Sequence, residues 1–130
     1  MPVLKTVKLR AAHNTLLNAT ILVSPRGMTL YHFTPEKAKK VVCTGKCSVF
    51  WPPLLIKRGA KPTAARGLDP KKLGTVKRPN GRYQVTYAGF PLYTFAADKK
   101  AGDVNGQGVE KTWYVIGPNG KVVKRTIAAG

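Results

Sequence analysis

Acidic residues are scarce in this sequence. Five Asp and Glu stand against 23 Lys and Arg in 130 residues, which gives a formal net charge of +18. The basic residues extend from Lys5 to Arg125 and are not confined to a tail. Such a surface attracts polyanions in a salt-dependent way, so the composition predicts an anionic partner without selecting one. The alternative interpretation is a basic protein adapted for solubility in an acidic or unusual medium.

Long apolar stretches are also missing. No run approaches the roughly 18 apolar residues that a membrane-spanning helix needs. Residues 1–10 alternate Lys with Val and Leu and lack the continuous apolar core of a signal peptide. We therefore expect a chain without a membrane span that is either unexported or has lost its export signal.

Cysteine is limited to one pair, Cys43 and Cys47, separated by three residues. Gly45 between them permits the sharp bend that a bridge requires, so a structural disulfide is the preferred interpretation, conditional on an oxidising compartment. A redox dithiol is the alternative, although its usual motif has two intervening residues. Metal binding by the pair is less favoured, because neither histidine has ligand spacing.

Signatures of catalysis are absent as well. The sequence shows no Ser-His-Asp pattern, no phosphate loop and no HExxH motif. We therefore predict that the protein is not an enzyme and needs no cofactor.

One acidic, glycine-rich stretch, residues 103–110, begins like a calcium loop. The twelfth position of an EF-hand loop requires a bidentate Glu and is Tyr114 here. A turn whose Asp and Asn side chains bond their own backbone is the preferred interpretation, and no metal site is predicted. The weak cation candidates are Asp98, Asp103, Asn105 and Glu110.

What the sequence does contain is one motif twice. Residues 27–37 and 89–99 both read G-x-x-L-Y-x-F-x-x-[DE]-K, and in each copy a Trp follows the Tyr by 20 residues. This repetition predicts one β domain over residues 1–130 built from two related units, about 18–56 and about 75–127. The shared positions are Tyr31, Phe33, Glu36 and Trp51 in the first unit, and Tyr93, Phe95, Asp98 and Trp113 in the second.

Two roles are open to the repeated aromatic residues. Alternation along a strand places the Tyr and the Phe of each copy on one face. The preferred interpretation is that they fill a core between two pseudo-symmetric halves, with the motif carboxylates as structural caps. The alternative is an exposed platform that stacks bases or sugars.

Turn signals indicate the fold class. Residues 24–27, 78–81 and 117–120 have Pro at the second position and Gly at the fourth, and Ala88-Gly89 forms a shorter turn. Such turns connect antiparallel strands, so we predict an all-β fold of hairpins forming a small barrel or a sandwich. Short helical turns are expected at 34–37 and 69–74, an edge strand at 4–9 and an exposed loop at 57–67.

The repeated unit resembles a bacterial lipoprotein family of secreted repeats of unknown function, which carries tandem Tyr-x4-Asp motifs. The second unit matches through residues 84–98, 102–108 and 113–115, and the first through 30–33, 43–47 and 51–54. The matching segments together extend over roughly residues 18–120.

The resemblance implies an extracytoplasmic envelope protein and supports a Cys43–Cys47 disulfide, but it implies no activity. Three departures stand out. Glu36 replaces the motif Asp in the first unit, no N-terminal lipidation cysteine is present, and the high positive charge is not a family feature.

The leading hypothesis is a non-enzymatic, secreted or envelope β-domain whose basic surface binds anionic polymers (wall polymer, polysaccharide or nucleic acid) or envelope proteins. The first alternative is a nucleic-acid-binding protein that uses basic patches and strand-face aromatics. The second is a redox or metal-handling protein that uses the cysteine pair. The predicted polyanion-binding residues are Lys39, Lys40, Lys57, Arg58, Lys71, Lys72, Lys77, Arg78, Lys99, Lys100, Lys124 and Arg125.

Overall fold

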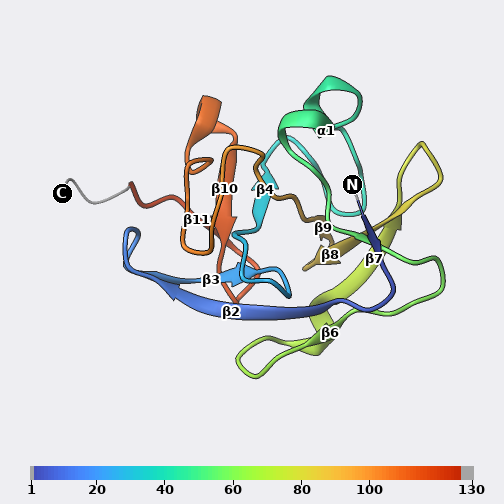
Figure 1. Cartoon of the computed structure of the whole chain (residues 1–130), viewed down its shortest axis with the longest axis horizontal. Helices are drawn as coiled ribbons and strands as arrows, with labels where there is room; N and C mark the ends of the chain where they lie inside the picture. The colour runs from blue at the N-terminus through green and yellow to red at the C-terminus, as the bar shows by residue number, and fades with distance from the viewer. Residues whose placement is uncertain (1, 127–130) are drawn as a thin grey trace.

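The computed structural model describes residues 2–126 and is built mainly of short β-strands (Figure 1). The strands are β1 (Val3–Leu4), β2 (Lys8–Asn14), β3 (Ala19–Val23), β4 (Tyr31–Phe33), β5 (Leu55–Ile56), β6 (Thr63–Ala64), β7 (Leu73–Lys77), β8 (Tyr83–Tyr87), β9 (Phe90–Pro91), β10 (Trp113–Ile116) and β11 (Val122–Val123). The helical segments are α1 (Lys46–Phe50) and the 3-10 turns η1 (Pro70–Lys72) and η2 (Val109–Lys111).

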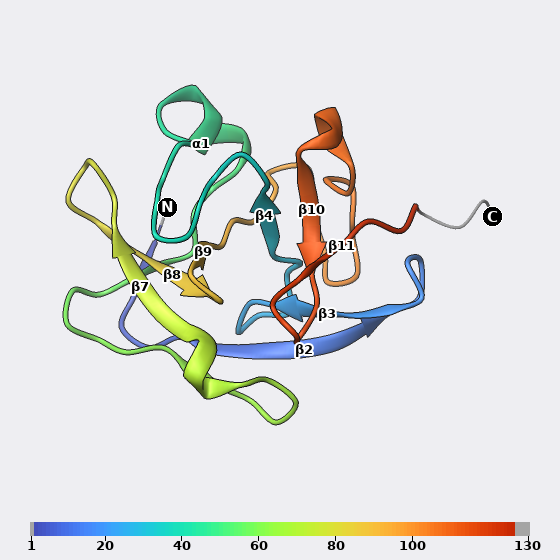
Figure 2. The ribbon, with the colours of Figure 1, turned by 180° about the vertical axis from the view of Figure 1, so that it is seen from behind.

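The strands form three sheets with the orders β1-β5-β8-β7 (β9 pairs with β8), β11-β10-β4 and β3-β2-β6. The long β2–β3 hairpin runs beneath the β4–β10–β11 sheet in both views (Figures 1 and 2). The described part contains no closed barrel, so the all-β prediction is confirmed as a small sandwich-like fold. None of its helices has the length and apolar character needed to cross a bilayer.

The three predicted Pro-x-Gly turns are present. Gly27, Gly81 and Gly120 have φ of 87°, 86° and 84°. Glycine adopts this left-handed backbone without the clash that a Cβ would introduce. Each glycine N–H donates to the carbonyl three residues earlier at 2.8–2.9 Å. The turns at 78–81 and 117–120 close the β7–β8 and β10–β11 hairpins.

Several local expectations need correction. The segment 34–37 forms a hydrogen-bonded turn rather than a helix, and the only α-helix in the described residues, α1, follows the first cysteine instead. The expected edge strand at 4–9 is divided between β1 and β2. Within the loop 57–67, two residues form β6, which pairs in parallel with β2.

The second helical signal, at 69–74, is confirmed in part. The Asp69 carboxylate accepts from the Lys71 N–H at 2.9 Å, which caps η1 as an N-cap side chain should. The end of the predicted turn is wrong, because Leu73 and Gly74 already belong to β7, where Gly74 pairs with Thr86.

The two related units meet at the tyrosines of their motifs. The Tyr31 N–H donates to the Tyr93 carbonyl at 2.7 Å, and the Tyr93 N–H donates to the Tyr31 carbonyl at 3.1 Å. Equivalent residues therefore face each other across an antiparallel bridge, the arrangement that a local two-fold relation between the units requires. This bridge brings both motifs into one core.

Buried side chains form two clusters. One is mainly aliphatic and includes Leu9, Leu22 and Leu30. The other contains the Tyr and Trp of both units together with Cys43 and aliphatic residues such as Ile21 and Val115. The sequence repeat thus supplies the four largest side chains of the second cluster.

Two turn glycines provide a test of the packing between hairpins. A Cβ on Gly81 would meet nothing within 4 Å, whereas a Cβ on Gly120 would stand 2.8 Å from the Ala88 Cβ. We expect Gly81→Ala to lower the free energy of unfolding by about 1–2 kcal/mol through backbone strain alone. Gly120→Ala should lower it by about 1–3 kcal/mol more through overpacking.

Urea denaturation measures both values, with the native protein as reference. Equal losses of stability in the two variants would contradict the close packing of the 117–120 turn against residue 88.

Candidate functional site

The core of the molecule holds two crossed hydrogen bonds. The Tyr31 hydroxyl donates to Asp98 Oδ2 at 2.7 Å, and the Tyr93 hydroxyl donates to Glu36 Oε2 at 2.6 Å. The tyrosine of each unit is thus bonded to the motif carboxylate of the other unit. All four side chains are buried, and the most accessible of them, Asp98, exposes 7% of its surface.

Each carboxylate also organises the loop that follows it. Glu36 Oε2 accepts from the Val42 N–H at 2.7 Å and from the Cys43 N–H at 2.9 Å. Asp98 Oδ1 accepts from the Asn105 N–H at 2.9 Å. Cys43 and Asn105 both lie seven residues after their carboxylate. Glu36 therefore takes the same structural place as the motif Asp.

Burial shapes the acid–base behaviour of these groups. It raises the pKa of the Tyr31 hydroxyl far above its ordinary value, and the hydrogen bond to Asp98 adds to the effect. It raises the pKa of Tyr93 in the same way, assisted by Glu36. Burial also raises the pKa of Asp98, against the opposing hydrogen bonds from Tyr31 and Asn105. Both hydroxyls therefore stay protonated and act as hydrogen-bond donors.

Four aromatic rings stack in a row beside these bonds. Phe95 lies 4.1 Å from Trp51, Trp51 lies 3.8 Å from Trp113, and Trp113 lies 4.4 Å from Phe33, measured between ring centroids. The two indole planes are 1° from parallel. The stack joins the two units a second time, because its central pair takes one Trp from each.

The tyrosines complete the cluster from the side. Tyr31 meets Trp51 edge-on at 5.4 Å, and Tyr93 meets Trp113 edge-on at 5.3 Å. These four residues expose at most 6% of their surface. These Tyr and Trp rings pack as a core, as the preferred interpretation predicts, and leave no free ring face on which bases could stack.

The disulfide is present, with an S–S distance of 2.03 Å and Cα atoms 5.2 Å apart. Cys43 is buried and linked to the core, because its N–H donates to Glu36 and its carbonyl accepts from Arg78 Nη2 at 2.8 Å. Cys47 is only half-buried. The predicted disulfide is confirmed, while a reversible redox function for it stays a prediction.

The weak cation candidates have other partners or lie apart. Asp103 Oδ2 accepts from the backbone N–H groups of Lys99 and Lys100 at 2.8 and 3.1 Å. These hydrogen bonds, the one from Lys99 first, lower the pKa of Asp103. Glu110 borders a different hollow. Within residues 2–126, no three His, Cys, Asp or Glu side chains gather closely enough to hold a metal.

Arg78 corrects the predicted set of polyanion-binding residues. It exposes only 4% of its surface, with Nη1 donating to Gln84 Oε1 at 2.7 Å and Nη2 donating to the Cys43 carbonyl. Its guanidinium lies 5.9 Å from the Tyr93 ring centre. Because the hairpin turn at 78–81 directs it inward, Arg78 supports the core and is not available to a polymer.

The remaining members of the basic doublets stay at the surface. Lys72 is half-buried, and the others are exposed: Lys39, Lys40, Lys57, Arg58, Lys71, Lys77, Lys99, Lys100, Lys124 and Arg125. Three of them come together at one place. Lys39, Lys71 and Lys72 line a hollow of about 320 Å³ with the hydroxyl-bearing Thr75 and Thr86.

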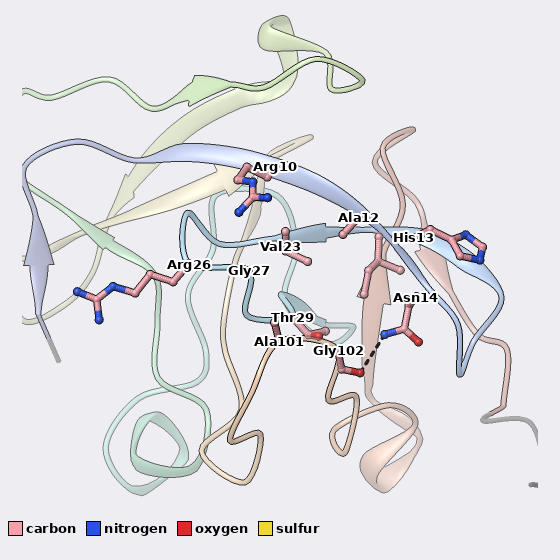
Figure 3. Close-up of a pocket in the computed structure, with 11 residues that line it drawn as sticks. Arg10, Ala12, His13, Asn14, Val23, Arg26, Gly27, Thr29, Ala101 and Gly102 are labelled. Carbon is pink, nitrogen blue, oxygen red and sulfur yellow. Dashed lines mark hydrogen bonds between the residues drawn. The ribbon is translucent and has the colours of Figure 1, made fainter.

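A second hollow, of about 370 Å³, lies beneath the β2–β3 hairpin (Figure 3). Arg10 and Arg26 stand at its border, and the Arg10 guanidinium donates to the Pro25 carbonyl at 3.3 Å. Asn14 bonds the Gly102 carbonyl at 3.0 Å across it, so this polar group already has a partner. The hollow gathers fewer cations than the one at Lys39.

A third hollow, also of about 370 Å³, opens at the edge of the aromatic stack. Phe33 and Phe95, the half-buried ends of the stack, line it together with Phe50 and Val109. Here the motif aromatics approach solvent.

Comparison with known proteins finds one family match, which lies in the second unit. Residues 74–116 match the model of a lipoprotein family described as a secreted repeat of unknown function. The match confirms the resemblance seen in the sequence, and the family description concerns secreted proteins. It covers Tyr93, Asp98 and Trp113, while their counterparts in the first unit lie outside the matched range. No curated protein and no solved structure matches the chain.

Sequence reasoning missed two residues of the site, Gln84 and Gly106, and the hydrogen bonds between the carboxylates and the loops. Gln84 is fully buried, and its side-chain oxygen accepts a hydrogen bond from Arg78. Gly106 leaves room for the stack, because a Cβ there would stand 2.8 Å from the Trp51 ring. The equal spacing of Cys43 and Asn105 from their carboxylates was the available signal for the loop hydrogen bonds.

The crossed hydrogen bonds can be tested by removing one hydroxyl at a time. Tyr31→Phe or Tyr93→Phe deprives a buried carboxylate of its only hydroxyl donor among the described residues. We expect each change to lower the free energy of unfolding by about 1.5–3 kcal/mol, the range for hydrogen bonds to charged groups.

Tyr114→Phe is the control, because this half-buried ring lies at the surface near Lys124 and contacts neither carboxylate. Urea denaturation at neutral pH should show a change within about 0.5 kcal/mol for it. If Tyr31→Phe and Tyr93→Phe change the free energy of unfolding by no more than this control does, the crossed hydrogen bonds do not stabilise the fold as we expect.

The buried His32 should make the stability of the fold depend on pH. It is buried against Phe90 with Nδ1 lacking a hydrogen-bond partner among the described residues, and burial lowers its pKa to about 4. The unfolded chain protonates this residue near pH 6.5, so His32 reduces stability as the pH falls from about 6.5 to about 4.

Asp98 has the opposite effect on stability. Because its pKa is raised, its contribution to stability falls as the pH rises above about 4. The native protein is therefore compared with His32→Gln, which keeps Asp98 and removes only the imidazole. The stability of the native protein relative to the variant should fall on acidification through this range. Parallel stability curves for the two proteins would contradict a buried neutral His32.

Proposed function

We propose that this protein is a non-enzymatic extracytoplasmic domain that binds anionic polymers through its exposed Lys and Arg side chains. The observation that carries the proposal is the separation of the two signs of charge. Two of the five acids, Glu36 and Asp98, are buried in the core. Two more, Asp69 and Asp103, accept N–H groups of their own loops. The surface therefore offers little negative charge to offset the 23 Lys and Arg residues.

The hollow at Lys39 is the position where an anionic group fits best. Three ammonium-bearing side chains border it from two separate segments, 39 and 71–72. Lys39 has a φ of 58° and its N–H donates to the Gly89 carbonyl at 2.6 Å, which fixes the backbone there. A residue other than Gly held in this region of backbone conformation is a pointer to function. The nearest acid along the chain to Lys71 and Lys72, Asp69, is engaged as the η1 cap.

The non-enzymatic part of the proposal is supported by the state of the reactive groups. The motif tyrosines and carboxylates bond one another in the core. The two sulfurs are joined to each other. A general base must reach a substrate proton, and these buried carboxylates face hydroxyls and backbone amides instead.

The test uses binding of heparin, an anionic wall polymer, duplex DNA and single-stranded DNA across a salt series. Lys39→Gln/Lys71→Gln/Lys72→Gln removes the three lysines of the hollow. Lys57→Gln/Arg58→Gln/Lys124→Gln removes three exposed charges elsewhere and serves as the matched control. We expect the first variant to bind more weakly, with a salt slope for duplex DNA reduced by about 0.9 for each phosphate that it no longer neutralises.

The control should bind more tightly than the first variant, although its net charge is the same. Equal affinities of the two variants would assign binding to net charge and remove the hollow from the proposal. Absence of binding to all four polymers by the native protein would refute the proposed function.

A further inference from the structure

Exposed apolar side chains gather at one end of the molecule. Among residues 2–126, five large hydrophobic side chains are exposed, and three of them lie within the short segment 42–50: Val42 at 56%, Val49 at 67% and Phe50 at 60%. The other two, Val3 and Leu16, are separated from this segment and from each other in the chain. Exposed apolar side chains concentrated in one short segment point to an interaction site.

These three residues are held together by the disulfide. Val42 precedes Cys43, and Val49 and Phe50 lie on α1, which contains Cys47. The bridge keeps Cα atoms 43 and 47 within 5.2 Å and so brings Val42 to the helix. We call residues 42–50 the α1 tip. It stands at the edge of the molecule in both views (Figures 1 and 2).

The backbone of the α1 tip is internally satisfied. Ser48 and Trp51 donate their N–H groups to the carbonyls of Gly45 and Cys47 at 3.1 and 2.9 Å. The Phe50 carbonyl accepts from the Ala96 N–H at 2.8 Å, which ties the tip to the second unit. Its apolar side chains therefore project from a fixed support.

Cations surround the α1 tip. Lys40 is exposed two residues before Val42, and Lys46 is exposed at the start of α1. Lys99 approaches from the second unit, since its ammonium donates to the Ala96 carbonyl at 3.0 Å. Arg82 shares a small hollow with Ser48 of the helix. Two acids lie on this side. Glu110 lines the aromatic hollow with Phe50 and is followed by Lys111, and the Asp103 carboxylate accepts from the Lys99 N–H at 2.8 Å.

We propose that the α1 tip docks the protein on anionic lipid bilayers. Val42, Val49 and Phe50 enter the boundary between head groups and acyl chains, while the surrounding Lys and Arg bind the lipid phosphates. Charge complementarity selects a bilayer rich in anionic lipid as the occupant. The projecting form of the tip favours a bilayer over a protein groove, because a bilayer accepts inserted side chains without a complementary cavity.

This inference goes beyond the proposed polymer binding and depends on different residues. Polymer binding needs the exposed cations alone. Docking on a bilayer also needs the apolar side chains, so an apolar-to-charged change separates the two.

The experiment measures binding to vesicles of phosphatidylglycerol and phosphatidylcholine, with pure phosphatidylcholine vesicles as reference, at physiological ionic strength. Val49→Asp/Phe50→Asp is compared with Val3→Asp/Leu16→Asp, which places the same two charges at the two exposed apolar positions outside the tip. We expect the tip variant to bind the anionic vesicles at least about tenfold more weakly than the control. Both variants should bind heparin alike.

A second measurement does not depend on a destabilising change. Val49→Trp places an indole on the tip, and Leu16→Trp places one outside it. Brominated lipid in anionic vesicles should quench the added fluorescence of the first variant, relative to the native protein, and leave that of the second unchanged.

The proposal is overturned if the native protein does not bind anionic vesicles, or if the tip variant binds them as tightly as the control. An unquenched Val49→Trp would show adsorption by charge without insertion and would also overturn it. In that case the exposed tip would belong to a protein partner. Failure of the native protein to bind heparin and the other polymers would instead refute the polymer proposal and leave the docking result intact.

Discussion

The fold depends on two buried hydrogen bonds that cross between its halves. A carboxylate taken from water into a core needs strong donors, because an unpaired buried charge is costly. Tyr31 supplies a donor to Asp98, and Tyr93 supplies one to Glu36. Each carboxylate also accepts from the backbone of the loop seven residues further on. The same four side chains therefore join the units and shape the loops between them.

The loop that Glu36 organises carries two surface features, which are Lys39 of the anion hollow and the α1 tip. The Glu36 carboxylate holds the N–H of Cys43, and the disulfide then sets the start of α1. Arg78 closes the arrangement from the inside by binding the Cys43 carbonyl. Lys39 lies in the same loop, between the carboxylate and the cysteine. The buried Glu36 carboxylate therefore helps to position both the Lys39 side of the candidate anion hollow and the start of the α1 tip.

Much of this could be read from the sequence. The Pro-x-Gly turns indicated the hairpins, because few other residues suit those backbone angles. The repeated Tyr, Phe and Trp indicated a shared aromatic core. The sequence could not show that each tyrosine bonds the carboxylate of the other unit. A repeat shows which residues are equivalent, but it does not show whether they contact their own copy or the other one. Arg78 looked like a surface cation, since burial of a guanidinium depends on acceptors distant in the chain, here Gln84 and Cys43. The helix α1 is too short to give a periodic signal.

The antiparallel bridge at Tyr31 and Tyr93 has a consequence for chains that carry only one unit. Because each tyrosine bonds the carboxylate of the other unit, a chain with a single unit would hold an unpaired hydroxyl and an unpaired carboxylate in its core. Two such chains would satisfy both groups by associating about the same local two-fold axis. The present protein meets the same requirement within one polypeptide, because it carries both copies of the motif.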